Sequence, residues 1–173
     1  LIEDCAHAHG SKWRGKGVGS FGDFGCFSFQ SSKQMNAGEG GYIIIKSKEH
    51  WKRALSYVNC GIGALPFSVL GGNYRLSEIH CAILIGALAD FKKSVNKMHD
   101  IIRIFTEEIS NIPNIDILYP YSNQSRRTCY CYGFRLNDNL LRKKTKKEFV
   151  ELLNLHGIPC VSDLYMPVYL TPE

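Results

Sequence analysis

The chain has 173 residues, of which 45% are hydrophobic and 21% charged, with a formal net charge of +5. This balance is that of an ordinary globular protein, so the composition argues against extended disorder. The modest positive charge permits anionic ligands but does not indicate nucleic-acid binding. The longest uncharged apolar run near the middle, residues 81–89, is too short to cross a bilayer, so we expect no membrane partner.

The first half of the chain predicts strands separated by turns, followed by one helix. Apolar runs indicate a short buried strand over residues 1–5 and further strands over residues 25–30 and 42–46. Glycines in residues 13–18 indicate a hairpin or turn. A helix is expected over residues 48–58, with Ser47 as its cap, and residues 61–74 are Gly-rich and predict a loop.

The second half predicts a long helical region and then a change of character. A helical spacing begins near residue 77, with Gly86 inside it, and a second helical pattern continues through residues 101–109 and stops before Pro113. Strands are expected near 115–118 and 128–136, followed by a helix that Thr145 opens with a capping box and Gly157 ends. These elements predict an α/β fold, with a larger domain over residues 1–112 and a smaller one over residues 113–173.

The two ends of the chain suggest a piece of a longer protein. The sequence opens on Leu1-Ile2-Glu3-Asp4, without an initiator Met and without the basic and apolar segments of a signal peptide. It closes on an extended stretch that contains proline. We therefore expect a cytoplasmic protein of which this chain is a fragment.

Seven cysteines lie at positions 5, 26, 60, 81, 129, 131 and 160. Their odd number and their scatter through apolar segments indicate a reduced compartment and not a disulfide framework. Cys129 and Cys131 could hint at a metal. However, the alternating residues Tyr130, Tyr132, Phe134 and Leu136 predict the apolar face of a strand over residues 128–136, and both cysteines then lie on its other face. Because no second pair of ligands lies nearby, we predict no metal site.

The stretch from Ser28 to Gly41 carries the first candidate site residue. An expected strand leads through Ser31 and Ser32 to Lys33 and then to a Gly-rich turn, whose glycines allow a close approach to a ligand. A desolvated lysine beside such a turn could form a Schiff base, since a lowered pKa makes the amine nucleophilic. From these residues alone, a surface lysine in a hairpin loop is the plainer interpretation.

The opening strand ends on the second candidate, Asp4. Ligand contacts in open α/β sheets lie at the carboxyl ends of strands, where a carboxylate can hold a ligand's ring nitrogen protonated. In the plainer interpretation, Asp4 caps a local turn. His7 and His9 would then be structural histidines, and their spacing offers a metal no third ligand.

Several motifs together resemble the DegT/DnrJ/StrS family of fold-type-I sugar aminotransferases. They occur in family order along nearly the whole chain. They are Glu3-Asp4-Cys5-Ala6-His7-Ala8-His9-Gly10, Gly22-Asp23, Phe27-Ser28-Phe29-Gln30-Ser31-Ser32-Lys33, Gly38-Glu39-Gly40-Gly41, Gly72-Asn73-Tyr74-Arg75-Leu76-Ser77-Glu78, Gly157-Ile158-Pro159 and Tyr165-Met166-Pro167-Val168-Tyr169.

This resemblance implies a role for each of five residues. Lys33 would bind pyridoxal 5'-phosphate (PLP) as a Schiff base and then move the proton between substrate and cofactor. Asp4 would pair with the pyridine nitrogen, and His7, where many members carry Gln, would lie near the ring hydroxyl. Ser28 would contact the phosphate. Asn73 would reach the phosphate in the neighbouring subunit, which implies a homodimer with shared active sites.

The resemblance also implies a fold and a reaction. The chain would be the C-terminal part of the large PLP-binding domain plus the start of the small domain, and the fragment alone would be inactive. The variants His7-Ala8-His9-Gly10 and Phe29-Gln30 are most similar to inosose aminotransferases and 3-amino-5-hydroxybenzoate synthase. We expect amino transfer from glutamine or glutamate to a keto-sugar, keto-cyclitol or related cyclic ketone, in secondary-metabolite or cell-surface sugar biosynthesis.

Two alternatives remain open. Some relatives carry out dehydration with a His in place of the Lys, and the presence of Lys33 argues against that reaction. A regulatory or sensory family member could instead bind PLP or a sugar nucleotide without turnover, although an intact Lys33 and Asp4 count against it.

Overall fold

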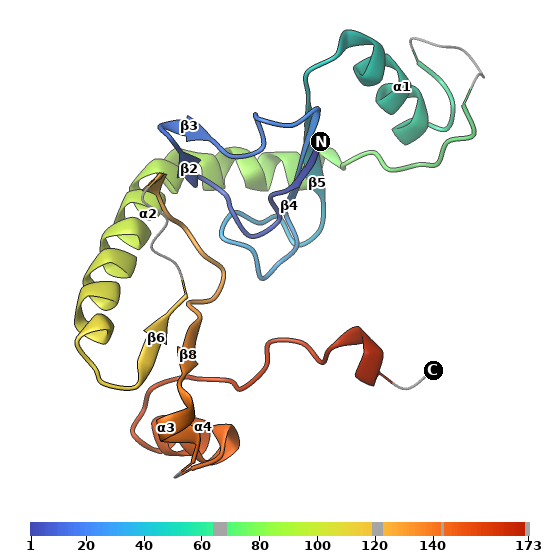
Figure 1. Cartoon of the computed structure of the whole chain (residues 1–173). Coiled ribbons are helices and arrows are strands. Elements are labelled where there is room, and N and C mark those ends of the chain that lie inside the picture. The colour runs from blue at the N-terminus through green and yellow to red at the C-terminus, as the bar shows by residue number, and fades with distance from the viewer. Residues whose placement is uncertain (64–68, 119–122, 143, 172–173) are drawn as a thin grey trace. The chain divides into compact units, whose positions relative to one another are not determined.

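The computed structural model describes residues 1–63, 69–118, 123–142 and 144–171. The described residues form two compact units that interleave along the chain. The first unit draws on residues 1–105 and 120–132, and the second on residues 106–119 and 133–173. Figure 1 shows the elements of both units along the ribbon.

The main sheet of the first unit has three strands in the order β1 (Ile2–Asp4), β4 (Phe24–Ser28) and β5 (Gly41–Ile45). Strand β1 runs parallel to β4, with Asp4 opposite Cys26, and β5 runs antiparallel to β4, with Gly41 opposite Ser28. These strands confirm the three expected from the apolar runs, within one or two residues at each end.

The expectation that residues 1–5 form a buried strand was wrong about burial. Leu1 and Ile2 are 76% and 69% exposed, and only Cys5, just past the strand, is buried. The reason is that β1 has a hydrogen-bonded neighbour on one side alone among the described residues. Strand β5 is likewise an edge strand, and the side chain of Ile43 is 50% exposed.

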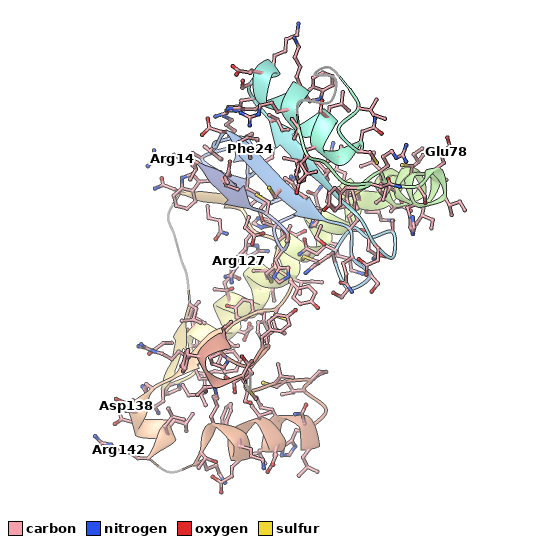
Figure 2. The ribbon with its side chains drawn as sticks, turned by 90° about the vertical axis from the view of Figure 1, so that its right-hand side faces the viewer. Arg14, Phe24, Glu78, Arg127, Asp138 and Arg142 are labelled. Atoms are coloured by element: carbon pink, nitrogen blue, oxygen red, sulfur yellow. The ribbon has the colours of Figure 1, made fainter. Side chains whose placement is uncertain are left out.

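A second sheet begins with the predicted hairpin. Strands β2 (Lys12–Trp13) and β3 (Lys16–Gly17) pair antiparallel, and β7 (Gln124–Arg126) joins the other side of β2. Arg14, labelled in Figure 2, and Gly15 form the turn, with φ values of 48° and 78°. Two successive positive φ values give the backbone twist that a two-residue hairpin needs.

Helix α1 (Lys48–Val58) begins and ends where the sequence predicts. The hydroxyl of Ser47 accepts a hydrogen bond from the backbone N–H of His50. The described part of the Gly-rich segment that follows contains no helix and no strand, only a bridge between Asn59 and Asn73. Residues 64–68 of this predicted loop lie outside the described residues.

Helix α2 (Glu78–Ser110) unites the two helical patterns in one element of 33 residues. Gly86 does not interrupt it, and a Cβ atom at that position would meet nothing within 4 Å. The helix ends three residues before Pro113, which cannot continue it. Neither this helix nor any other in the described part of the chain has the length and apolarity that a membrane crossing requires.

The second unit contains a small antiparallel sheet, two helices and a final 3₁₀ turn. Strand β6 (Ile115–Ile117) pairs with β8 (Phe134–Leu136), followed by α3 (Asp138–Leu141), α4 (Lys146–Leu155) and η1 (Val168–Leu170). The predicted capping box is present, because Thr145 and Glu148 exchange side-chain and backbone hydrogen bonds.

The strand predicted over residues 128–136 was wrong for most of its length. Only Phe134–Leu136 is a strand, and residues 127–133 have no ladder partner. Side-chain contacts hold residues 127–133 in place of the backbone hydrogen bonds of a β-ladder. Thr128 bonds to Ser11 through its hydroxyl, and the ring of Tyr132 meets that of Phe105 edge-on at 4.9 Å.

Candidate functional site

Two of the predicted site residues lie at the same edge of the main sheet. Asp4 ends β1 and Ser28 ends β4, and since these strands are parallel their carboxyl ends share one edge. Oδ1 of Asp4 accepts a hydrogen bond from the N–H of Ala6 at 3.1 Å, and Oγ of Ser28 accepts one from Gln30 at 3.2 Å. The carboxylate is exposed and the hydroxyl is half-buried.

Lys33 follows β4 and turns back toward the segment after β1. Its N–H donates to the carbonyl of Gln30 at 2.9 Å, which closes a turn and holds the backbone of Lys33 near the end of the strand. Its Nζ atom lies 2.5 Å from Nε2 of His7. The structure therefore brings together Lys33 and His7, which belong to two separate sequence motifs.

Tyr130 completes this cluster and was not predicted as a site residue. Its ring stacks on the imidazole of His7, with centroids 4.4 Å apart and planes inclined by 20°. Nζ of Lys33 also lies 4.9 Å from the centroid of the Tyr130 ring. The sequence carried no signal for this contact, because the alternation of aromatic residues placed Tyr130 on the apolar face of a strand.

His9 lies buried beside the cluster, with 2% of its surface exposed. Burial lowers its pKa, against the attraction of the Ser28 carbonyl, and electrostatic interaction with the nearby Lys33 and His7 side chains lowers it further. Neither ring nitrogen has a hydrogen-bond partner of normal geometry among the described residues. The His9 ring lies in a T-shaped arrangement with Phe27, with centroids 5.4 Å apart, and is tilted against the ring of Phe29 at 6.2 Å.

Asn73 is not joined to this cluster within the described residues. Its backbone pairs with Asn59 after α1, and its Oδ1 accepts a hydrogen bond from Nε of Arg75 at 2.9 Å. No hydrogen bond links it to Lys33 or Ser28 in the part of the chain that the structure describes. Its expected role toward a second subunit stays a prediction.

Two of the glycines after Lys33, Gly40 and Gly41, are explained by packing inside the chain. Gly40 has a φ of +132°, and a Cβ atom there would lie 2.6 Å from Cδ1 of Leu76. At Gly41 a Cβ atom would lie 2.6 Å from the carbonyl oxygen of Phe27. The chain therefore needs glycine at both positions whether or not a ligand approaches.

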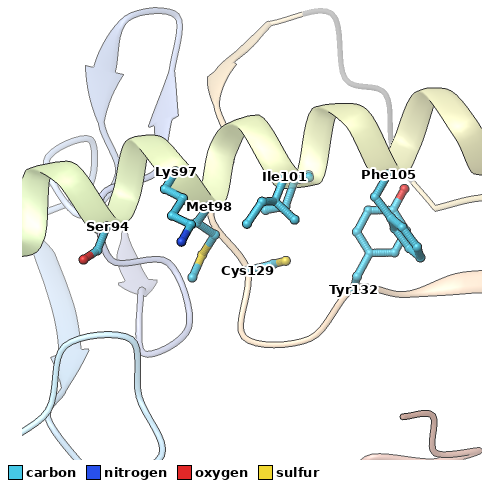
Figure 3. A pocket seen from close by; sticks show the side chains of 8 residues that line it. Ser94, Lys97, Met98, Ile101, Phe105, Cys129 and Tyr132 are labelled. Carbon is cyan, nitrogen blue, oxygen red and sulfur yellow. The ribbon is translucent and has the colours of Figure 1, made fainter. Parts of the chain in front are cut away.

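An apolar hollow of about 420 Å³ lies along α2 (Figure 3). Neither Lys33 nor His7 belongs to its lining. Its lining residues are Ser94, Lys97, Met98, Ile101, Ile102, Phe105, Cys129 and Tyr132. Among the described residues, no group of three or more His, Cys, Asp or Glu side chains could hold a metal ion.

A model of the DegT/DnrJ/EryC1/StrS aminotransferase family matches residues 1–173. The chain belongs to this family. The resemblance found in its sequence motifs is thereby confirmed.

Two relatives match the branches that the motifs suggested. The L-glutamine:scyllo-inosose aminotransferase of Streptomyces griseus is 29% identical over 185 aligned positions, covering 99% of this chain and 43% of that protein. The 3-amino-5-hydroxybenzoate synthase of Amycolatopsis mediterranei is 34% identical over 101 positions, covering 55% of this chain and 26% of that protein.

A solved structure of a family aminotransferase from Brucella abortus has a similar fold. It superimposes with a TM-score of 0.83 and 24% sequence identity, and the match covers 98% of this chain and 44% of that one. This chain therefore spans less than half the length of each of these three relatives. Its fold is a mixed α/β part of the fold-type-I aminotransferase structure.

Aminotransferases of this family use PLP. The side chains at the carboxyl edge fit that cofactor by their chemistry. Lys33 supplies an amine for an aldehyde, Asp4 a carboxylate for a pyridinium N–H, and Ser28 a hydroxyl for a phosphate.

Proposed function

We propose that this chain is the lysine-bearing part of a PLP-dependent aminotransferase. It would transfer an amino group from glutamine or glutamate to a keto-sugar, keto-cyclitol or related cyclic ketone. The observation that carries this proposal is the Lys33–His7 pair, beside an edge where Asp4 and Ser28 end adjacent parallel strands. Family membership and the relatives named for glutamine and scyllo-inosose support the donor and the acceptor class.

Lys33 has two tasks in this proposal. Its Nζ atom would hold PLP through the cofactor's aldehyde carbon, with loss of one water molecule, and the bound PLP would supply the electron sink for the reaction. Nζ would also be the base that accepts the proton from Cα of the amino donor and returns a proton on the acceptor side. His7, whose Nε2 lies 2.5 Å away, would accept a hydrogen bond from the amine and restrain its position.

Asp4 and Ser28 would hold the two ends of the cofactor. The Asp4 carboxylate would accept a hydrogen bond from the ring nitrogen and stabilise its protonated form. Only Oδ1 of Asp4 is engaged among the described contacts, and by a single local N–H. The Ser28 hydroxyl would donate to the phosphate, since its present hydrogen bond uses the oxygen as an acceptor.

Asn73 would act across a subunit boundary in a homodimer. Its amide nitrogen can donate to a phosphate, while its amide oxygen is held by Arg75. Each active site of the homodimer would then contain residues from both copies of the whole protein.

The proposal is tested by the amino-donor half-reaction of the full-length protein. Loaded with PLP and given glutamine or glutamate, the wild type should release the keto acid and accumulate pyridoxamine phosphate. Lys33→Ala should slow this conversion by about 10²–10⁴-fold, the range for loss of a positioned acid–base group. Lys48→Ala, on the exposed first turn of α1, is the matched control and should match the wild type. PLP or sugar-nucleotide binding without any conversion would favour a regulatory protein instead.

A further inference from the structure

Buried and part-buried hydrogen bonds join the segment that carries Tyr130 to the segment that carries His7. The hydroxyls of Ser11 and Thr128 lie 2.7 Å apart, and the N–H of Thr128 donates to Oγ of Ser11 at 3.0 Å. Oγ1 of Thr128 also donates to the carbonyl of His9 at 2.8 Å, and Nε of Arg126 to that of Gly10 at 2.7 Å. These contacts fix the register of residues 126–128 against residues 9–11.

Tyr130 lies two residues after these hydrogen bonds, so its position relative to His7 is restrained. Its ring covers one face of the imidazole at 4.4 Å and lies 4.9 Å from Nζ of Lys33. His7 is exposed and would otherwise rotate about two torsions in solvent. The stack thus limits the orientations in which Nε2 can face the amine.

The ring also acts on Lys33 directly. The face of an aromatic ring carries partial negative charge and attracts an ammonium group within about 6 Å of its centroid. A charged Lys33 donates to His7, so Nε2 of His7 must then be unprotonated and the ring proton must lie on Nδ1. Both contacts restrain the flexible side chain of Lys33 to one region of the site.

We propose that Tyr130 is a positioning residue for Lys33, acting directly and through His7. The inference rests on the proposed function, because positioning matters only if the Lys33 amine reacts. The contact requires the ring and not the phenol oxygen. Tyr130→Phe should therefore preserve it, and Tyr130→Leu should remove it.

The first test uses the full-length protein without cofactor and with isotope-labelled lysine. Protons on Cε of Lys33, assigned with Lys33→Arg, should resonate upfield of other lysines because Nζ, one bond away, lies over the Tyr130 ring. Tyr130→Leu should shift this signal to the position of the other lysines, and Tyr130→Phe should keep it upfield. Tyr132→Leu is the matched control, since Tyr132 faces Phe105 instead, and should leave the Lys33 signal unchanged.

The second test follows the consequence for reactivity. The rate at which Lys33 forms a borohydride-trapped adduct with PLP should fall by about two- to fivefold in Tyr130→Leu, because His7 without its stacked ring faces the amine for a smaller share of the time. Tyr130→Phe should stay within about twofold of the wild type.

Two results would overturn the inference. One is a wild-type Lys33 signal without an upfield shift, which can be read even if Tyr130→Leu fails to fold. The other is an adduct rate in Tyr130→Leu equal to that of the wild type. A wild type that forms no adduct on Lys33, yet shows the upfield signal, would contradict the proposed function and leave the contact itself established.

Discussion

Ser11 and Thr128 are 117 positions apart in the chain, and their hydroxyl oxygens form a buried hydrogen bond of 2.7 Å. Oγ1 of Thr128 also donates to the carbonyl of His9, and the backbone N–H of Thr128 donates to Ser11. A closed set of buried hydrogen bonds of this kind rigidifies the contact between two segments.

Removing the Thr128 hydroxyl should therefore destabilise the protein. Thr128→Val keeps the shape but leaves the Ser11 hydroxyl and the His9 carbonyl without their partner, and we expect a loss of about 1–3 kcal/mol in the free energy of unfolding. Urea denaturation measures this loss. Thr128→Ser retains the hydroxyl and should recover most of it. In a double-mutant cycle with Ser11→Ala the two effects should not add; simple additivity would contradict the buried hydrogen bond.

Glu3 should make stability fall at acid pH. Burial opposes ionisation of this side chain, but the N–H groups of Gly22, Gly19 and Phe21 outweigh it and hold the pKa below the ordinary value of 4.5. As the pH falls, Glu3 is therefore protonated at a higher pH in the unfolded chain than in the folded protein. The contribution of Glu3 is complete above pH 4.5 and is lost as the pH falls through the folded value.

Glu3→Gln tests this dependence directly. At pH 7 the variant should unfold at a lower urea concentration than the wild type, and the difference should shrink as the pH falls below 4.5. A difference that stays constant down to pH 3 would show that the carboxylate charge is not what holds these N–H groups.

His9 should give a second pH dependence, at higher pH. Because the folded protein holds the His9 pKa below 6.5, the unfolded state binds the proton first and stability should fall as the pH drops below 6.5, by up to about 1.4 kcal/mol per pH unit. His9→Leu removes the buried ring and should flatten this slope in unfolding experiments between pH 5 and 7. His156→Leu, which replaces an exposed histidine, should keep the wild-type slope.

The thiol of Cys5 should be the slowest to react among the cysteines. Burial, with the carboxylates of Glu3 and Asp4 nearby, raises its pKa to about 11. About one molecule in a thousand then carries the thiolate at pH 8, and the thiolate is the nucleophile. Iodoacetamide followed by peptide mass spectrometry should label the exposed Cys60 and Cys131 well before Cys5. Equal labelling of Cys5 in folded protein would contradict its burial.

The local signals in the sequence predicted local structure well. Ser47 caps α1, Thr145 and Glu148 form the capping box of α4, and the turn at Gly15 closes a hairpin. Each of these features depends on residues within a few positions of one another, so the sequence contains the whole interaction.

The candidate site could be predicted only in part, because its contacts join remote segments. Motifs identified Lys33 and His7 separately, and nothing in either motif indicated that their nitrogen atoms meet. The strand expected over residues 128–136 failed for a related reason. Alternating aromatic residues look the same whether they line a sheet or, as with Tyr130 and Tyr132, contact a histidine and a helix.

The claim that Lys33 binds the cofactor is tested most directly by locating a trapped adduct. The full-length protein is incubated with PLP, reduced with borohydride and digested, and the modified peptide is identified by mass spectrometry. We expect one dominant pyridoxyl group on Lys33, which disappears in Lys33→Ala and persists in Lys48→Ala. Modification spread evenly over surface lysines, with Lys33 unmodified, would contradict it.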